Sequence, residues 1–285
     1  MNGGALIGLI IMVGSEGATL AQIEPFWSWN TPIAWTGFIL FADSVVWRAR
    51  GNSWIRSSTL EFGCLALGSI ALWLVFELYN RFIDNWYYVG LPESPWLRYL
   101  GYAWSFATIW PAIFEGAELV AVWRGDRQST VGSRHRLHAT PTEYRLAFSR
   151  PMTLSVAIGL AMLALPLAWP SRYLAAPVWL GFIFLLDPVN AWLGAESFLW
   201  DLRTGQFDRI KNLALSGLLC GGLWEFWNYW SRAKWHYTVP IMEQLKIFEM
   251  PVPGYLGFPA FAFECFAMYV FVRASLGRVG RTIAL

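Results

Sequence analysis

The stretch GFILFAD at residues 37–43 decides the fold, because it returns almost unchanged as GFIFLLD at residues 181–187. Two more pairs follow in the same order: ELYN at 77–80 with EFWN at 225–228, and PAIFE at 111–115 with PAFAFE at 259–264. Matching positions are about 145 residues apart throughout, which is typical of an internal duplication. Each repeated stretch combines an apolar run with an acid. The sequence therefore predicts two similar helical units with acids at equivalent places inside them.

The composition places these units in a membrane. Of 285 residues, 56% are hydrophobic and only 14% are charged, which is too apolar for a water-soluble domain. Eight segments supply the roughly 17 to 22 apolar residues that cross a hydrocarbon core. They lie near residues 4–21, 31–48, 59–80, 100–122, 152–169, 175–193, 211–230 and 254–273. We expect an all-α, polytopic membrane bundle of about eight transmembrane helices.

The eight segments divide into two units of four. We expect a first four-helix repeat at residues 1–123, a basic linker at 124–150 and a second repeat at 151–285. Because four spans are an even number, both repeats enter the membrane in the same direction. The sequence thus predicts two parallel repeats related by a pseudo-twofold axis along the membrane normal.

Basic residues predict the orientation. If eight spans are correct, 15 of the 21 Lys and Arg residues lie on the side of the termini. The opposite side has only Arg81, Arg98, Arg172, Arg232, Lys234 and Lys246. By the positive-inside rule both termini are cytoplasmic, and we expect a bacterial inner membrane protein. No basic residue precedes the apolar run at residues 5–13, so we read this run as a retained helix and not as a signal peptide. The net charge of +2 gives no reason to expect a nucleic-acid partner.

Acids linked to prolines are the first candidates for chemistry. Glu115 follows Pro111 by about one turn, and Glu264 follows Pro259 similarly. A proline frees a helix carbonyl and leaves a more polar stretch of backbone, where a carboxyl group could act as a general acid. An ionised acid costs about 2.5 to 3.5 kcal/mol at the centre of a membrane helix, which favours a functional reason for keeping it.

Three further acids complete the predicted catalytic set. Asp43 and Asp187 reach a depth of roughly 18 Å, close to that of Glu115 and Glu264, and would tune or relay protons. A buried structural hydrogen bond is the alternative for both. Glu118 lies on the same face as Glu115 but has no counterpart in the second repeat, so we expect the two sites to differ.

The predicted substrate-binding residues lie on the side of the membrane away from the termini. Each repeat carries an aromatic connection there, with Trp86 and Tyr88 in one and Trp235 and Tyr237 in the other. We expect these connections to fold back over a cleft as re-entrant or interfacial segments; an interfacial aromatic belt is the alternative. Glu77 with Asn80, and Glu225 with Asn228, end the preceding helices. They would bind substrate or form interhelical hydrogen bonds.

No metal or cofactor motif is present in the sequence. The pair His135 and His138 lacks a third ligand at zinc spacing, and the three cysteines show no CxxC pattern. We therefore expect no metal site and no cofactor, and any reaction would depend on acid–base chemistry in an aromatic-lined cleft.

These elements resemble the lycopene cyclase domain of the heterodimeric and fused carotenoid cyclases. The likeness rests on Trp86, Tyr87 and Tyr88 with Pro111, Glu115 and Glu118, and on Trp235, His236 and Tyr237 with Pro259 and Glu264. Here the proline and glutamates are more loosely spaced, and each repeat has an extra helix. The resemblance implies an isomerase of carotenoid biosynthesis that protonates a long polyene, stabilises the carbocation on aromatic faces and then removes a proton.

Two other classes of function fit the same residues. A non-enzymatic subunit would use the aromatic surface to bind a pigment, quinone or lipid within a larger membrane complex. A proton-coupled carrier would use the acids as relay sites. In each case the partners are membrane lipid and an apolar molecule of isoprenoid or pigment type.

Overall fold

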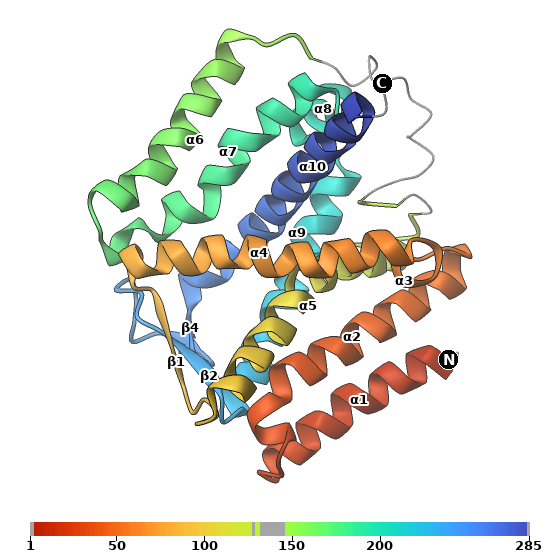
Figure 1. Cartoon of the computed structure of the whole chain (residues 1–285), viewed down its shortest axis with the longest axis vertical. Coiled ribbons are helices and arrows are strands. Elements are labelled where there is room, and N and C mark those ends of the chain that lie inside the picture. Colours follow the sequence, from red (N-terminus) through yellow and green to blue (C-terminus); the bar gives the residue numbers. More distant parts are fainter. Residues whose placement is uncertain (1–2, 127–128, 132–145, 284–285) are drawn as a thin grey trace.

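Eight long helices dominate the structure, a computed structural model that describes residues 3–126, 129–131 and 146–283 (Figure 1). They are α1 (Gly3–Leu20), α2 (Phe26–Arg50), α4 (Thr59–Ile83), α5 (Pro95–Trp123), α6 (Arg150–Ala168), α7 (Ala175–Leu193), α9 (Asp208–Trp230) and α10 (Gly257–Ile283). Each of the eight predicted spans falls largely within one of these helices. Most of the linker predicted at 124–150, with His135 and His138, lies outside the described residues.

Short elements connect the long helices. They are the helices α3 (Trp54–Ser57) and α8 (Phe198–Thr204), the 3-10 turns η2 (Arg172–Leu174) and η3 (Val252–Leu256), and the strands β1 (Trp86–Val89), β2 (Lys234–Tyr237), β3 (Lys246–Ile247) and β4 (Met250–Pro251). The protein is thus mostly helical, with a small amount of β structure that the sequence reading did not include.

Six of the helices are long and apolar enough to cross a membrane, by length and composition, within the described part of the chain. They are α1, α4, α5, α6, α7 and α10, the last two taken with the 3-10 turns before them. The other two long helices are more polar. Helix α2 opens on FWSWNTP, and α9 begins with Asp208, Arg209 and Lys211. The chain is an integral membrane protein by this criterion, and the count of eight spans remains a prediction.

Glycines bring the outer helices into backbone contact. A Cβ atom on Gly8 of α1 would lie 2.6 Å from the carbonyl oxygen of Gly37 in α2. A Cβ on Gly159 of α6 would lie 2.8 Å from the carbonyl oxygen of Gly181 in α7. Small residues allow close helix approach in a membrane, where association depends on packing and not on exclusion of water. The pairs α1/α2 and α6/α7 therefore join in the same way.

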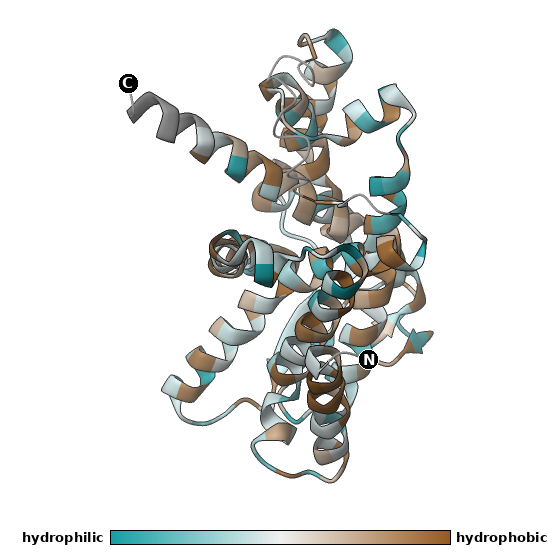
Figure 2. Ribbon diagram, turned by 90° about the vertical axis from the view of Figure 1, so that its right-hand side faces the viewer, coloured by the Kyte–Doolittle hydropathy of each residue, from teal (hydrophilic) through white to brown (hydrophobic). Residues whose placement is uncertain are grey.

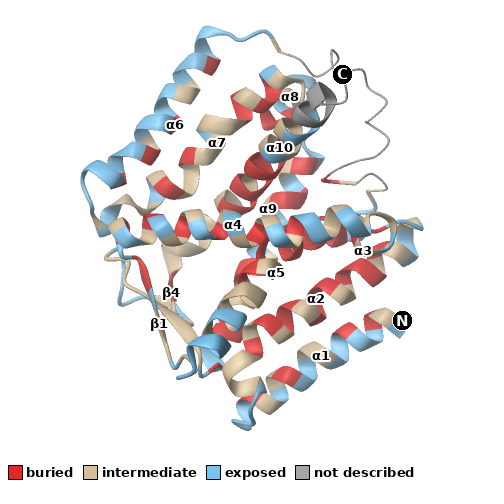
Figure 3. Cartoon of the chain, in the orientation of Figure 1, coloured by how far each residue is buried: buried red, intermediate tan, exposed pale blue. Residues whose placement is uncertain are grey.

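The inner helices form the core. Helix α5 is buried along most of its second half, whereas α6 exposes most of its side chains (Figure 3). Many large apolar side chains are exposed on the long helices, and apolar residues occur along much of the length of these helices (Figure 2). Helices α5 and α9 meet where Gly116 faces Ser216, whose hydroxyl donates to the carbonyl of Ile113 at 2.7 Å. An apolar exterior around a buried core is what a lipid environment requires.

The outer ends of the first and last helices and the short helices lie on one side of the molecule, and strands β1 and β2 lie on the other. The start of α1, the short helices α3 and α8 and the far end of α10 lie toward one side of the molecule, and β1 and β2 lie toward the other (Figure 1). This arrangement places the short helices of the described loops at residues 49–58 and 194–210 at the opposite end of the bundle from the aromatic connections.

Strands from the two halves of the chain pair with each other. β1 and β2 form an antiparallel ribbon in which Trp86 faces Tyr237 and Tyr88 faces Trp235. We call this two-stranded element the ribbon. The aromatic connections, expected to be re-entrant or interfacial segments, thus satisfy their backbone groups partly through each other.

Candidate functional site

An aromatic cavity of about 460 Å³ lies beside the ribbon. Its volume falls within the range of roughly 300 to 1,000 Å³ that is usual for small-molecule sites. Both halves of the chain line it, with residues from the starts of α2, α5, α7 and α10 and from the ribbon. Its tryptophans are Trp29, Trp35, Trp73, Trp86, Trp179, Trp224 and Trp235.

Alternate residues of the ribbon face the cavity. Trp86 and Tyr88 of β1 and Trp235 and Tyr237 of β2 all line it, and so does Lys234 at the start of β2. Substrate binding by the four aromatic residues stays a prediction. The intervening His236 is directed to Glu249, whose Oε2 lies 2.7 Å from its Nδ1. This follows from the period of two in a strand, which sends neighbouring side chains to opposite faces.

Two glutamates outside the cavity lining accept hydrogen bonds from the tyrosines of the ribbon. Oε1 of Glu77 accepts hydrogen bonds from the Tyr88 hydroxyl at 2.5 Å, from Trp73 Nε1 at 2.9 Å and from Trp86 Nε1 at 3.3 Å. Burial, and then the charge of Glu77, raises the pKa of the Tyr88 hydroxyl well above 10. The phenol therefore keeps its proton and stays a hydrogen-bond donor to Glu77.

The second half repeats this arrangement. The Tyr237 hydroxyl donates to Glu225 Oε1 at 2.8 Å and accepts from Trp235 Nε1 at 2.8 Å. Burial and the Glu225 carboxylate raise the pKa of Tyr237 well above 10. Neither Glu77 nor Glu225 is among the residues that line the cavity. Both glutamates affect the cavity only indirectly, because they hold the tyrosine side chains that line it.

Two asparagines fix the backbone of the ribbon. Asn80 donates to the Trp86 carbonyl at 2.8 Å and accepts from the Trp86 amide at 3.2 Å. Asn228 donates to the Trp235 carbonyl and accepts from its amide, both at 2.9 Å. These contacts join each helix to the strand that follows it, and the predicted substrate-binding role of the two asparagines stays a prediction.

The proline-linked glutamates lie away from the cavity wall. Glu115 is only 1% exposed, and neither of its oxygens receives an N–H or O–H donor from the described residues. Its carboxyl group interacts with that of Asp43. The structure thus brings this predicted Asp and Glu together, outside the cavity lining.

Glu264 has different surroundings. It is fully buried, its Oε1 lies 3.2 Å from the Phe182 amide nitrogen, and its Oε2 has no hydrogen-bond partner among the described residues. It does not line the cavity, although Phe261, one turn earlier, does. The surroundings of the two proline-linked acids therefore differ.

Asp43 and Asp187 receive backbone amides at the starts of the short helices. Asp187 accepts from Phe198 at 2.7 Å and from Leu199 at 2.9 Å, at the start of α8. Asp43 accepts from Ile55 at 2.9 Å, in α3. A carboxylate in this position satisfies amides that have no partner inside the helix. These contacts supply the structural hydrogen bonds that were the alternative to a catalytic role.

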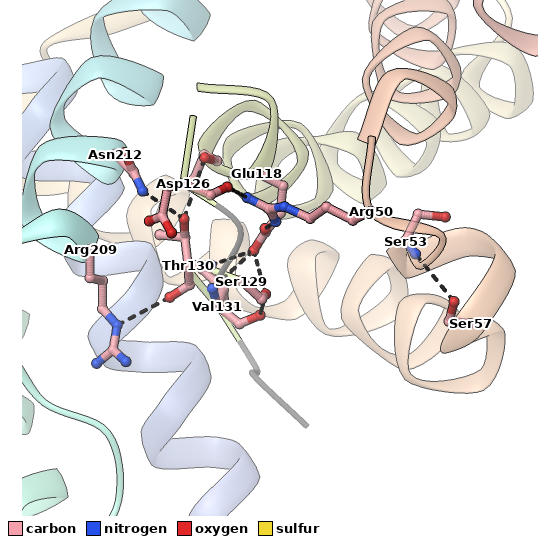
Figure 4. Close-up of polar contacts among 11 residues, drawn as sticks. Arg50, Ser53, Ser57, Glu118, Asp126, Ser129, Thr130, Val131, Arg209 and Asn212 are labelled. Atoms are coloured by element: carbon pink, nitrogen blue, oxygen red, sulfur yellow. Dashed lines mark hydrogen bonds and ion pairs between the residues drawn. The ribbon is translucent and has the colours of Figure 1, made fainter. Parts of the chain in front are cut away.

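Glu118 is the centre of a polar network near the end of α5 (Figure 4). Its Oε2 forms a buried ion pair with Arg50. Its Oε1 accepts from the Ser129 hydroxyl at 2.7 Å, the Thr130 amide at 2.8 Å and the Val131 amide at 3.0 Å. Glu118 therefore attaches the segment at residues 129–131 to the helical core. Its predicted catalytic role stays a prediction.

The sequence reading missed several aromatic residues that shape the cavity. Trp73 contacts Trp224 with ring centroids 5.9 Å apart and Phe261 at 5.8 Å, and Trp179 contacts Phe261 at 5.4 Å. The only signal in the sequence was proximity to the repeated glutamates. Trp73 precedes Glu77 by one helical turn, and Trp224 directly precedes Glu225. With 19 tryptophans in the chain, that signal could not single them out.

The cavity lining has a simple charge pattern. It contains Arg98 and Lys234 but no Asp, Glu or His. Among the described residues, no group of three or more His, Cys, Asp or Glu side chains could hold a metal ion. The arrangement thus suits a largely apolar molecule in contact with indole and phenyl faces.

Comparison with known proteins gives no family for this chain. No protein-family model matches the sequence, and no curated protein and no solved structure matches it.

Proposed function

We propose that this membrane protein binds an elongated isoprenoid lipid in the aromatic cavity. The single observation that carries the proposal is the cavity itself, about 460 Å³ and lined by seven tryptophans, four tyrosines and aliphatic side chains from both halves. Aromatic side chains offer large apolar faces that contact the unsaturated carbons of an isoprenoid. Such a ligand would lie beneath the ribbon, across the junction of the two halves.

A two-repeat architecture is part of this proposal. Matched contacts support it: Glu77 with Tyr88 and Glu225 with Tyr237, Asn80 and Asn228 on the strand backbones, and Asp43 and Asp187 at the short helices. The antiparallel pairing of one strand from each half is what a pseudo-twofold axis through the ribbon would produce. With eight spans, the ribbon would lie on the non-cytoplasmic side of a bacterial inner membrane.

The test of lipid binding is to fill the cavity. Gly101 lines it, and a Cβ atom there meets nothing within 4 Å, so Gly101→Phe adds a ring without displacing the backbone. Gly68→Phe in α4 is the matched control, because Gly68 has equally open space and does not line the cavity. Geranylgeraniol would be titrated into purified protein in nanodiscs while tryptophan fluorescence is followed.

We expect Gly101→Phe to weaken geranylgeraniol binding about fivefold to 150-fold, since overpacking of a filled site typically costs about 1 to 3 kcal/mol. Gly68→Phe should bind as the wild type does. Equal binding by all three proteins would refute the proposed site.

Acid–base catalysis is the second candidate, as a cyclase or isomerase of a polyene. The aromatic faces that would stabilise a carbocation support it. The proton donor would be Glu115 or Glu264, which would require a path from the helix core to the cavity. Expression in cells that accumulate acyclic carotenoids, followed by pigment chromatography for the wild type, Glu115→Gln and Glu264→Gln, tests this function. Unchanged pigments with correctly inserted wild-type protein would favour the non-enzymatic subunit instead.

A further inference from the structure

We propose that the ligand is a prenyl phosphate, with its phosphate at Arg98 and its isoprenoid tail in the aromatic cavity. This inference rests on the proposed function, since it assigns a head group to the lipid that the cavity binds. It follows from the charges of the cavity wall and from the position of Arg98 in the fold.

The two cations of the cavity wall differ in how they are neutralised. Lys234 lies 3.3 Å from Glu249 Oε1 and donates to the Tyr229 carbonyl at 3.1 Å. Its charge is thus balanced by an acid outside the cavity lining. Arg98 donates through Nε and Nη2 to the carbonyl of Pro92, at 3.3 and 3.1 Å. No carboxylate of the described residues lies within ion-pair distance of this guanidinium group.

The place of Arg98 in α5 also leaves its charge uncompensated. Arg98 lies in the first turn, where the positive end of the helix dipole disfavours a cation. Its side chain is half-buried at the cavity wall. A half-buried, unbalanced cation at this end of a helix is stabilised by a bound anion.

The cavity continues from Arg98 along one face of α5. Gly101, Tyr102 and Ser105 follow at helical spacing, and all of them line it. A head group at Arg98 would therefore direct its tail along this face toward the indole rings. The molecule that matches a guanidinium group at one point and an aromatic apolar wall elsewhere is an amphiphile with an anionic head and an unsaturated tail. Guanidinium is planar and donates two parallel hydrogen bonds to phosphate oxygens.

The test compares three lipids in nanodiscs made of a zwitterionic lipid. Geranylgeranyl phosphate is the proposed class, geranylgeraniol has the same tail without the charge, and phosphatidic acid has the phosphate on acyl chains. Each is titrated against wild type, Arg98→Gln and Arg81→Gln. Gln at position 98 keeps an N–H donor for Pro92 but loses the charge, and Arg81 is an exposed arginine that does not line the cavity.

We expect wild type to bind geranylgeranyl phosphate about tenfold to hundredfold more tightly than geranylgeraniol. Arg98→Gln should remove that preference and leave geranylgeraniol binding unchanged, while Arg81→Gln should retain it. Raising the salt concentration should weaken binding of the phosphate and not of the alcohol. The salt series needs only wild-type protein, so it applies even if Arg98→Gln does not fold.

Three results would overturn the prenyl phosphate. They are equal binding of alcohol and phosphate by wild type, an unchanged preference in Arg98→Gln, and equal binding of phosphatidic acid, which would make Arg98 a contact for membrane phospholipid. In all three, geranylgeraniol binding that is lost in Gly101→Phe keeps the proposed function. Failure of geranylgeraniol to bind wild type, or its unchanged binding to Gly101→Phe, refutes the isoprenoid site itself.

Discussion

The buried carboxylate of Glu118 gives the sharpest stability prediction. Its two oxygens have separate tasks: Oε2 pairs with Arg50, and Oε1 receives the Ser129 hydroxyl and the amides of Thr130 and Val131. Three substitutions separate these tasks. Arg50→Met removes the cation, Glu118→Gln removes the charge but keeps an acceptor oxygen, and Glu118→Leu removes both.

The magnitudes follow from what each variant leaves unpaired. Removing one partner of a buried ion pair typically costs about 3 to 5 kcal/mol. Arg50→Met should fall near the lower end, because three donors still reach the Glu118 carboxylate. Glu118→Gln should cost a similar amount. Glu118→Leu should cost at least about 2 kcal/mol more than Glu118→Gln, because two buried amides lose their acceptor and each costs about 1 to 3 kcal/mol.

The assay is the free energy of unfolding in detergent micelles, measured by denaturant titration and followed by tryptophan fluorescence. A difference below about 0.5 kcal/mol between Glu118→Leu and Glu118→Gln would refute the reasoning, because Oε1 would then not hold residues 129–131. Loss of activity in a Glu118→Gln protein of wild-type stability would instead favour the catalytic role predicted from the sequence.

Three further predictions concern packing, titration and capping. Gly8→Ala should lower the melting temperature because its Cβ would lie 2.6 Å from the carbonyl oxygen of Gly37, whereas Gly14→Ala, with open space around its Cβ, should raise it slightly through helix propensity. Tyr88 and Tyr237 have folded-state pKa values raised above the ordinary value of 10. The stability that they contribute is therefore present below pH 10 and is lost as the pH rises through the folded pKa. Thermal melts from about pH 8 to 11, with tyrosinate absorbance, measure this loss. Asp187→Ala should destabilise the protein by about 0.5 to 2 kcal/mol, and Asp187→Asn by less, because Asn keeps an acceptor for the amides of α8; chemical denaturation of both variants compares them.

The helices could be predicted from the sequence because each depends on a local property. A run of about 18 apolar residues in lipid must satisfy its backbone internally, and a helix does this without any partner. The eight predicted segments accordingly coincide with the eight long helices. Gly37 and Gly181, within the repeated stretches, also mark the places where the outer helices touch.

The ribbon could not be predicted, because it depends on two distant segments. WYYV and KWHY are four residues each, too short for a strand signal, and each finds its hydrogen-bond partner in the other half of the chain. The same limit applies to Arg50. From the sequence it was one of many basic residues near a helix end, and only the packing of α2 against α5 places it on Glu118.

The cavity is not lined by the acids that the sequence analysis selected, for a related reason. Proline spacing and helical depth correctly suggested buried glutamates, and Glu115 does meet Asp43. Neither property reports which side of a helix faces empty space, and the cavity formed at the aromatic starts of the helices instead. Arg98 did leave a trace in the sequence, as one of the few basic residues on the sparsely charged side.

The pairing of β1 with β2 has a consequence for how the protein is made. The two strands are separated by the whole of helices α5 to α9, so a contact of this kind closes late and slowly during folding. Until residue 237 has left the ribosome, the first half would hold an unpaired strand and an open aromatic surface in the membrane. Separate expression of residues 1–131 and 146–285, which keeps the donors of Glu118, should therefore yield two fragments that are unstable alone and stable together, because the ribbon joins them.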